Sequence, residues 1–312
     1  MVNRCRGSLR MSLLYALLAS LGFGVGDFAA TVGARRHQPL VVAFVAQGTG
    51  FIGALVLAPF ITTDLPSVAQ CGWAAAAGLF GAGAFAAFLW SLANGPVGVV
   101  APVSAVISVI VPIAAGLFEG ERPSLAAWIG VVVAVSAILS LSMGGPRGHV
   151  SSRVLLGAIA TGLGFGVFYV LFDRAATTSN GLWPVVMARA ASVGLQLTLI
   201  RTLGGARSSR RAPGLGEPAG ARRPLRAWVP AGVMDALRDR MVLTAGALDT
   251  TANAFLLYAL SRGRLSIAAV IISLYPASTI ILARTVLHEH LRRLQIAGLV
   301  GATVAIALVS RG

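Results

Sequence analysis

The sequence predicts an all-α, polytopic membrane protein whose ten transmembrane helices form two inverted five-helix repeats. The composition is 56% hydrophobic and only 11% charged, with a mean hydropathy of +0.83, whereas soluble domains contain about 25% charged residues. Ten apolar windows are long enough to cross a hydrocarbon core about 30 Å thick. Residues 77–142 also align without a gap onto 245–310, at a constant offset of 168. This alignment has 17 identities in 66 positions, against about 7 expected by chance.

The predicted spans divide into five plus five. The first five lie near 12–33, 40–61, 72–92, 97–118 and 125–143, and the second five near 154–173, 182–203, 241–260, 265–286 and 294–310. A polar linker, 144–153, separates a first repeat (1–143) from a second (154–312). The longest connection, at about 204–240, is basic and rich in Gly and Pro, so we expect a flexible loop.

The repeat extends to the front of each half. Alternate glycines occur in the first span of each copy: Gly22, Gly24 and Gly26, then Gly162, Gly164 and Gly166. We expect them to allow close helix packing, and we overlay Gly22 on Gly162, which makes Val167 the counterpart of Asp27. An odd number of spans per copy inserts the second copy upside down, with a pseudo-twofold axis in the membrane plane.

Three charged residues fall within predicted spans and are the main candidates for a transport site: Asp27, Arg189 and Asp249. Inserting a charged residue at the centre of a transmembrane helix costs about 2.5–3.5 kcal/mol of free energy, so such groups usually face a cavity or a partner. Asp27 is either a proton carrier or counter-ion for a cationic substrate, or a structural group paired with Arg189 or held neutral by hydrogen bonds. Arg189 requires an anion, which is Asp27, Asp249 or a substrate carboxylate.

Uncharged polar residues extend this candidate site. Asn253 lies one helical turn after Asp249, so the pair either lines a cavity for a polar cargo or makes interhelical hydrogen bonds. Tyr169 and Tyr275 either offer hydroxyls and ring faces to a substrate or serve in packing.

Two prolines and two glutamates are candidates for structural or hinge roles. Pro102 and Pro276 kink their spans, for hinge motion or for packing. Glu121 and Glu289 occupy equivalent positions in the two copies. We interpret both as structural, each accepting hydrogen bonds from the N-terminus of the next helix.

Several function classes are disfavoured. The net charge of +15 comes from arginines that lie mainly between apolar runs, which indicates topology and contact with anionic lipids, not nucleic-acid binding. Two cysteines and the His288–His290 segment do not make a metal site, and we predict no metal and no cofactor. The sequence contains no HExxH or GxSxG motif, so a membrane enzyme acting on a lipid-linked substrate is a minor alternative. A non-transporting scaffold is another.

Glutamate and glycine residues that recur at equivalent positions of the two copies resemble the pattern of a known family. Glu121 is followed nine residues later by Gly130, and Glu289 by Gly298, with Ser273-Leu274-Tyr275-Pro276 upstream in the second copy. With the glycine-rich first spans, this pattern resembles the EamA-type ten-helix transporters of the drug/metabolite transporter superfamily over essentially the whole chain. The resemblance implies proton-coupled or facilitated transport of amino acids, other small metabolites or amphipathic drugs. Carriers of sugar derivatives are the alternative within the superfamily.

Orientation is the point on which the residues and the resemblance disagree. Eight arginines lie on the side of the termini and fourteen on the other, which by the positive-inside rule places the termini outside. The resemblance implies cytoplasmic termini, and we adopt that arrangement for a plasma-membrane exporter. One chain holds both halves of a pathway, so a monomer suffices, and a dimer is compatible with the sequence.

Overall fold

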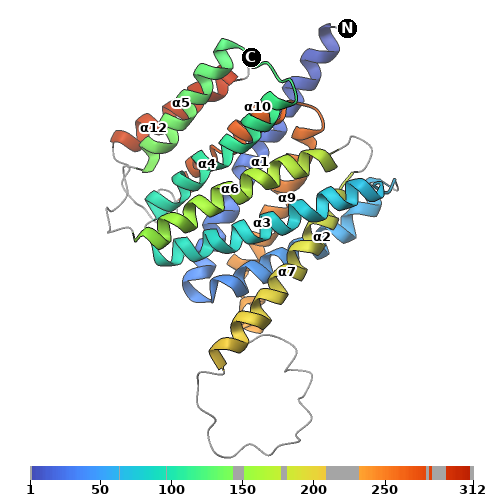
Figure 1. Ribbon diagram of the computed structural model, residues 1–312, viewed down its shortest axis with the longest axis vertical. Coiled ribbons are helices and arrows are strands. Elements are labelled where there is room, and N and C mark those ends of the chain that lie inside the picture. The colour runs from blue at the N-terminus through green and yellow to red at the C-terminus, as the bar shows by residue number, and fades with distance from the viewer. Residues whose placement is uncertain are drawn as a thin grey trace, which may run out of the picture.

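The computed structural model describes residues 2–62, 64–95, 97–142, 151–176, 181–208, 232–278, 281–282 and 293–309. These residues are helical apart from short turns and connections, and none forms a strand. Figure 1 shows long helices packed side by side, with α1 beginning and α12 ending at the same end of the molecule.

Helices account for both halves of the chain. In the first half they are α1 (Val2–Arg36), α2 (Pro39–Ile61), α3 (Val68–Asn94), α4 (Val97–Phe118) and α5 (Leu125–Ser142). In the second half they are α6 (Ser152–Ala175), α7 (Trp183–Ser208), α8 (Val233–Ala236), α9 (Arg240–Leu260), α10 (Leu265–Ile272) and α12 (Arg293–Val309). Part of the predicted 204–240 loop is therefore helical, because α7 continues to Ser208 and α8 precedes α9.

Local signals explain several helix starts. Pro39 occupies the first turn of α2, where its missing N–H removes no intrahelical hydrogen bond. Ser67 and Gln70 form a reciprocal capping box before α3, which satisfies two backbone N–H groups at the helix start. The Asp239 side chain accepts a hydrogen bond from the N–H of Met241 at the start of α9.

Six of the helices in the described ranges are long and apolar enough to cross a membrane: α1, α2, α3, α4, α6 and α7. Three further apolar helices are shorter, at Leu125–Ser140, Leu265–Ser278 and Ile296–Leu308. Helix α9 has 21 residues but holds several polar groups. The structure thus supports an all-helical protein with several spans, while the number ten stays a prediction.

Helix packing follows an internal pseudo-symmetry. Helix α1 packs along α9 as α6 packs along α3, α2 contacts α9 as α7 contacts α3, and α1 contacts α10 as α6 contacts α4. Each pair is converted into the other by exchanging the two halves. Three further pairs, α2 with α7, α4 with α10 and α5 with α12, join equivalent helices, as expected around a twofold axis.

Two further contacts are related by the same exchange of the halves. Gly95 at the end of α3 lies against Val154 at the start of α6, and its equivalent, Gly263 at the end of α9, lies against Ser12 near the start of α1. Ser12 also donates a hydrogen bond to the Ala259 carbonyl. Each contact thus joins the end of α3 or α9 to the beginning of the helix that packs along it.

Glycine contacts correct the predicted overlay of the first helices. A Cβ on Gly22 would lie 2.9 Å from Ala252 Cβ, and a Cβ on Gly164 would lie 2.9 Å from Ala84 Cβ. Ala84 and Ala252 are equivalent at the offset of 168, so Gly22 corresponds to Gly164 and not to Gly162. The offset for α1 and α6 is therefore 142, and the counterpart of Asp27 is Tyr169, not Val167.

The same offset holds for α2 and α7. Gly78 of α3 packs directly on the Ala188 carbonyl of α7, and its equivalent, Gly246 of α9, packs on the Ala46 carbonyl of α2. Ala46 and Ala188 are 142 residues apart. A single equivalence, at the offset of 142, therefore covers α1 and α2 against α6 and α7.

Two four-helix units follow from these contacts. The first unit comprises α1, α2, α9 and α10, and the second comprises α6, α7, α3 and α4. Helices α5 and α12 pack mainly on each other and lie to one side of both units (Figure 1). The pseudo-twofold axis exchanges the units, so the interface between them is the place for a central site.

The two prolines predicted to kink their spans lie within α4 and just after α10. Pro102 lies inside α4 and is buried. Helix α10 stops at Ile272, passes through a turn at 273–274, and resumes helical geometry at Tyr275, just before Pro276. Pro276 has no N–H to continue the ladder, which explains the break.

Glu121 has a different partner from the one predicted. Its carboxylate accepts hydrogen bonds from the N–H of Leu265, at 2.9 Å, and from the Ser266 hydroxyl. It therefore caps α10 of the other repeat, and not the next helix, α5. Gly130 and Gly298 are buried in α5 and α12, whereas Glu289 lies outside the described residues.

Candidate functional site

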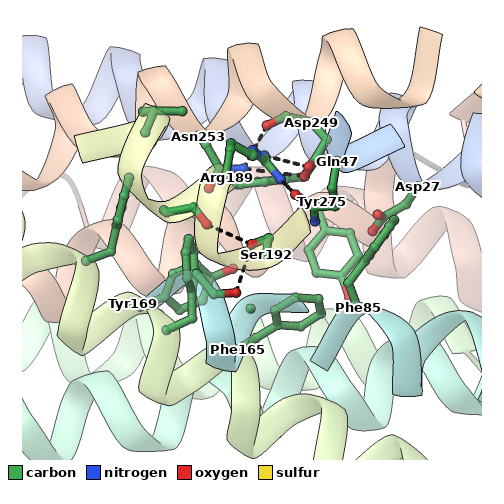
Figure 2. Close-up of a pocket in the computed structure, with 17 residues that line it drawn as sticks. Asp27, Gln47, Phe85, Phe165, Tyr169, Arg189, Ser192, Asp249, Asn253 and Tyr275 are labelled. Atoms are coloured by element: carbon green, nitrogen blue, oxygen red, sulfur yellow. Dashed lines mark hydrogen bonds and ion pairs between the residues drawn. The ribbon is translucent and has the colours of Figure 1, made fainter. Parts of the chain in front are cut away.

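A cavity of about 660 Å³, its mouth included, lies between the two units (Figure 2). Its polar lining residues come from α1, α2, α6, α7, α9 and the helical turn at 275–278: Asp27, Gln47, Tyr169, Arg189, Ser192, Asp249, Asn253 and Tyr275. Five phenylalanines complete most of the wall: Phe23, Phe85, Phe165, Phe168 and Phe172. An apolar wall with a few polar groups directed into the same space is typical of small-molecule sites.

Arg189 and Asp249 connect the two units across the cavity. Arg189 Nη2 of α7 lies 2.6 Å from Asp249 Oδ2 of α9 as an ion pair, and Nη1 donates a hydrogen bond to Gln47 Oε1 of α2. Both charged side chains are largely buried, with exposed fractions of 6% and 18%. Of the three anions that the sequence offered to Arg189, the structure selects Asp249.

Asp27 also reaches the cavity, from α1, but stands apart from this network (Figure 2). Within the described part of the chain, no cation lies within salt-bridge distance of its carboxylate. The predicted alternative of a salt bridge to Arg189 is therefore wrong. Its nearest electrostatic neighbours are Asp249, Tyr169 and Tyr275.

The remaining predicted polar residues line the same space. Asn253 donates its amide to the Asp249 carbonyl at 2.7 Å on its own helix, so it lines the cavity without an interhelical hydrogen bond. Tyr169 of α6 and Tyr275, in the helical turn at 275–278, are both 5% exposed and line the cavity. Tyr258, by contrast, lies away from the cavity, where Arg262 stacks over it at 5.2 Å.

Repeat-related positions surround the cavity but carry different residues. At the corrected offsets the pairs are Phe23 with Phe165, Asp27 with Tyr169, Gln47 with Arg189, Gly81 with Asp249, and Phe85 with Asn253. Only the first pair is identical. The axis thus passes through the cavity, while the charges on its two sides differ.

Sequence reasoning missed Gln47, Ser192 and the phenylalanines. Ser192 is buried and donates to the carbonyls of Gly78 and Ala188, which secures α7 on α3. A signal for Gln47 was present, because it is the repeat counterpart of Arg189 at the offset of 142. The repeat also offered a signal for Phe23 and Phe165, which are counterparts of each other, and for Phe85, the counterpart of Asn253. No such signal marks Phe168 or Phe172 in the apolar helix α6.

The described residues include no cluster of three or more His, Cys, Asp or Glu side chains that could hold a metal ion. The His288–Glu289–His290 segment lies outside these residues.

Comparisons with known proteins agree with this architecture. A solved structure titled "Crystal structure of protein" matches with a TM-score of 0.65 over 94% of this chain and 97% of that chain, at 14% identity, which establishes the shared fold. No curated protein sequence matches the chain. The family model of the EamA-like transporter family matches twice, at residues 10–143 and 152–311. The chain is a multi-pass membrane protein of two repeats, and it belongs to the EamA-like transporter family, within the drug/metabolite transporter superfamily.

Proposed function

We propose that this protein is a secondary transporter that moves a small polar or amphipathic metabolite by alternating access through the central cavity. The observation that carries the proposal is the position of the cavity, between two repeat-related units and lined by charged groups from both. Substrate sites of inverted-repeat transporters lie at such interfaces, and the units move against each other around them. We assign ten spans to this architecture, with repeats at 1–143 and 154–312.

The first and second units are joined at the end where α1 begins. Trp183 Nε1 at the start of α7 donates to the Thr62 carbonyl at the end of α2, at 3.3 Å. Glu121, after α4, holds Leu265 at the start of α10. Both contacts cross between the units, so opening the cavity toward this end requires both to break.

The Arg189–Asp249 ion pair crosses the same interface at the cavity itself. Rearrangement of the units changes the separation of these two charges, and so couples the contents of the cavity to its access. Gln47 lies on α2, in the same unit as Asp249, so its hydrogen bond to Arg189 crosses the same interface and changes together with the ion pair.

Asp27 is the proposed site of proton coupling, because it is the cavity carboxylate without a cation partner among the described residues. We propose export across the plasma membrane with both termini in the cytoplasm, and we assign no cofactor. A single chain contains the complete cavity, so we propose a functional monomer.

The test is a metabolite uptake and efflux screen in proteoliposomes at pH 6 and pH 8. We expect at least one small metabolite to cross in the presence of the protein, at a rate that changes with the imposed pH gradient. Asp27→Asn should remove the dependence on the gradient, whereas Asp64→Asn, at an exposed connection, should behave as wild type. Transport that is unaffected by both pH and Asp27→Asn refutes proton coupling, and absence of any transport refutes the proposed function.

A further inference from the structure

We infer that the substrate is an organic monocation with an aromatic or similarly apolar body, bound at Asp27 in competition with a proton. This inference rests on the proposed transport function and names the substrate class for the same cavity. It follows from the distribution of charge, the lining of the wall and the hydrogen bonds already made by Arg189.

The charges of the cavity do not balance. Arg189 is matched by Asp249 at 2.6 Å, and this leaves Asp27 as a second carboxylate. When all three groups are ionised, their sum is one negative charge in a space that is largely apolar. A ligand with one positive charge neutralises this sum, whereas a neutral or zwitterionic ligand does not.

The wall suits a cation with an apolar body. Seven of the 17 lining side chains are aromatic, and aromatic faces attract cations, including quaternary ammonium groups, when water is excluded. Tyr169 and Tyr275 line the same cavity as Asp27. The carboxylate and the ring faces are therefore available to the same ligand.

A zwitterion requires more rearrangement. To bind a substrate carboxylate, Arg189 must give up Asp249 or Gln47, both of which it contacts. To bind a substrate cation, Asp27 gives up no ion pair with a described residue. The arrangement seen here therefore favours a cation at Asp27 over a carboxylate at Arg189.

A proton and a cation neutralise the same carboxylate, so they exclude each other. The other charged or titratable groups that line the cavity with Asp27 are Asp249 of α9, Arg189 of α7, Tyr169 of α6 and Tyr275 just after α10. Asp249 and Arg189 offset each other. A cation that enters the protonated cavity sends the proton to bulk water, and a proton that enters the occupied cavity releases the cation.

The experiment uses four aromatic probes that differ mainly in charge: benzyltrimethylammonium (cation), phenylalanine (zwitterion), phenylacetate (anion) and benzyl alcohol (neutral). Calorimetry on the purified full-length chain measures their binding at pH 6 and pH 8. We expect benzyltrimethylammonium to bind at least tenfold more tightly than the other three, and more weakly at pH 6 than at pH 8. Proton release should appear as a heat that varies with the ionisation enthalpy of the buffer.

Variants locate the site. Asp27→Asn should weaken benzyltrimethylammonium binding at least tenfold and remove its pH dependence, while Asp27→Glu should retain both. Asp64→Asn is the matched control and should bind as wild type. If Asp27→Asn does not fold, the charge series and the pH dependence of the wild-type protein decide the question.

Two results overturn the inference. Binding of phenylalanine or phenylacetate in preference to benzyltrimethylammonium, or of no probe at all, refutes a cation site, and a positive metabolite screen then still leaves the transport function standing. Cation binding that does not depend on pH refutes competition with a proton.

Discussion

The Glu121 carboxylate of the first repeat accepts a hydrogen bond from the Leu265 backbone N–H of the second repeat, at 2.9 Å. A residue located 144 positions away in sequence thus caps the start of α10. The Ser266 hydroxyl donates to the same carboxylate. This contact joins the two four-helix units at one end of the molecule.

Glu121→Ala should therefore destabilise the protein. The substitution leaves the Leu265 N–H and the Ser266 O–H without their acceptor, at a cost of about 2–3 kcal/mol for hydrogen bonds to a charged group. Ser266→Ala removes one donor together with one of its bonds and should cost less, about 1 kcal/mol. Thermal melting in detergent measures both, and equal melting temperatures for wild type and Glu121→Ala would show that the cap is not needed.

Gly78 and Gly246 should tolerate no side chain. An added Cβ at either position meets a backbone carbonyl of the other repeat, which cannot move aside as a flexible side chain can. Because overpacking costs about 1–3 kcal/mol or more, Gly78→Ala and Gly246→Ala should lower the melting temperature and the yield of folded protein. Gly83 on the same helix as Gly78 has nothing within 4 Å, so Gly83→Ala is the control and should fold normally. Wild-type melting of both packing variants would contradict the corrected register.

Substitutions of Arg189 and Asp249 should have strongly non-additive effects on the free energy of unfolding. Asp249→Asn removes the counter-ion of a largely buried guanidinium, and breaking a buried pair costs about 3–5 kcal/mol. Arg189→Gln should be similarly harmful, whereas the double variant should be more stable than the sum of the single effects predicts. A double-mutant cycle on unfolding free energy measures this, and additive effects would indicate that the two charges act independently.

The contacts of Asp239, which join the end of α1 to the start of α9, should make the stability of the fold depend on pH in the acid range. Its partial burial raises its pKa, but the Met241 N–H, the His37 side chain and the charge of Arg36 outweigh this, so the pKa lies below its usual value. A lowered folded-state pKa stabilises the fold above the ordinary pKa of Asp, about 3.9, and this contribution is lost as the pH falls through the lower folded value.

The stability difference between wild type and Asp239→Asn should therefore be largest near neutral pH and shrink as the pH falls below about 4. Denaturation measured across this range tests the prediction. The hydrogen bond to His37 spans 3.2 Å and Arg36 lies 3.5 Å away. A stability difference that grows on acidification would have the wrong sign.

Much of the architecture was predictable because duplication leaves a direct trace in the sequence. The offset of 168 gave the equivalence of α3 with α9 and α5 with α12. The offset of 142 was equally visible, since Leu21-Gly22-Phe23-Gly24-Val25 recurs unchanged at residues 163–167. Following the alternate glycines alone placed the overlay two residues away from the register that the helix contacts show.

The cavity was predictable only in part. Asp27, Arg189 and Asp249 were identified because buried charge is costly in a membrane. The choice of Asp249 as the partner of Arg189 depends on how α7 crosses α9, and the capping of α10 by Glu121 depends on how the two units meet. Both are tertiary relationships between helices that are distant in sequence, and local patterns do not determine them.

The unequal residues at equivalent cavity positions have an energetic consequence. In the proposed transport cycle, two identical halves would make the inward-open and outward-open states equivalent by a twofold rotation. The two states would then have equal populations and equal affinity for cargo on both faces of the membrane. With Asp27 opposite Tyr169 and Arg189 opposite Gln47, the two states differ in the electrostatic environment that each offers to a ligand. A fused, diverged pair of repeats can therefore hold one resting state and release cargo more readily on one face, which a symmetric pair of separate subunits cannot do.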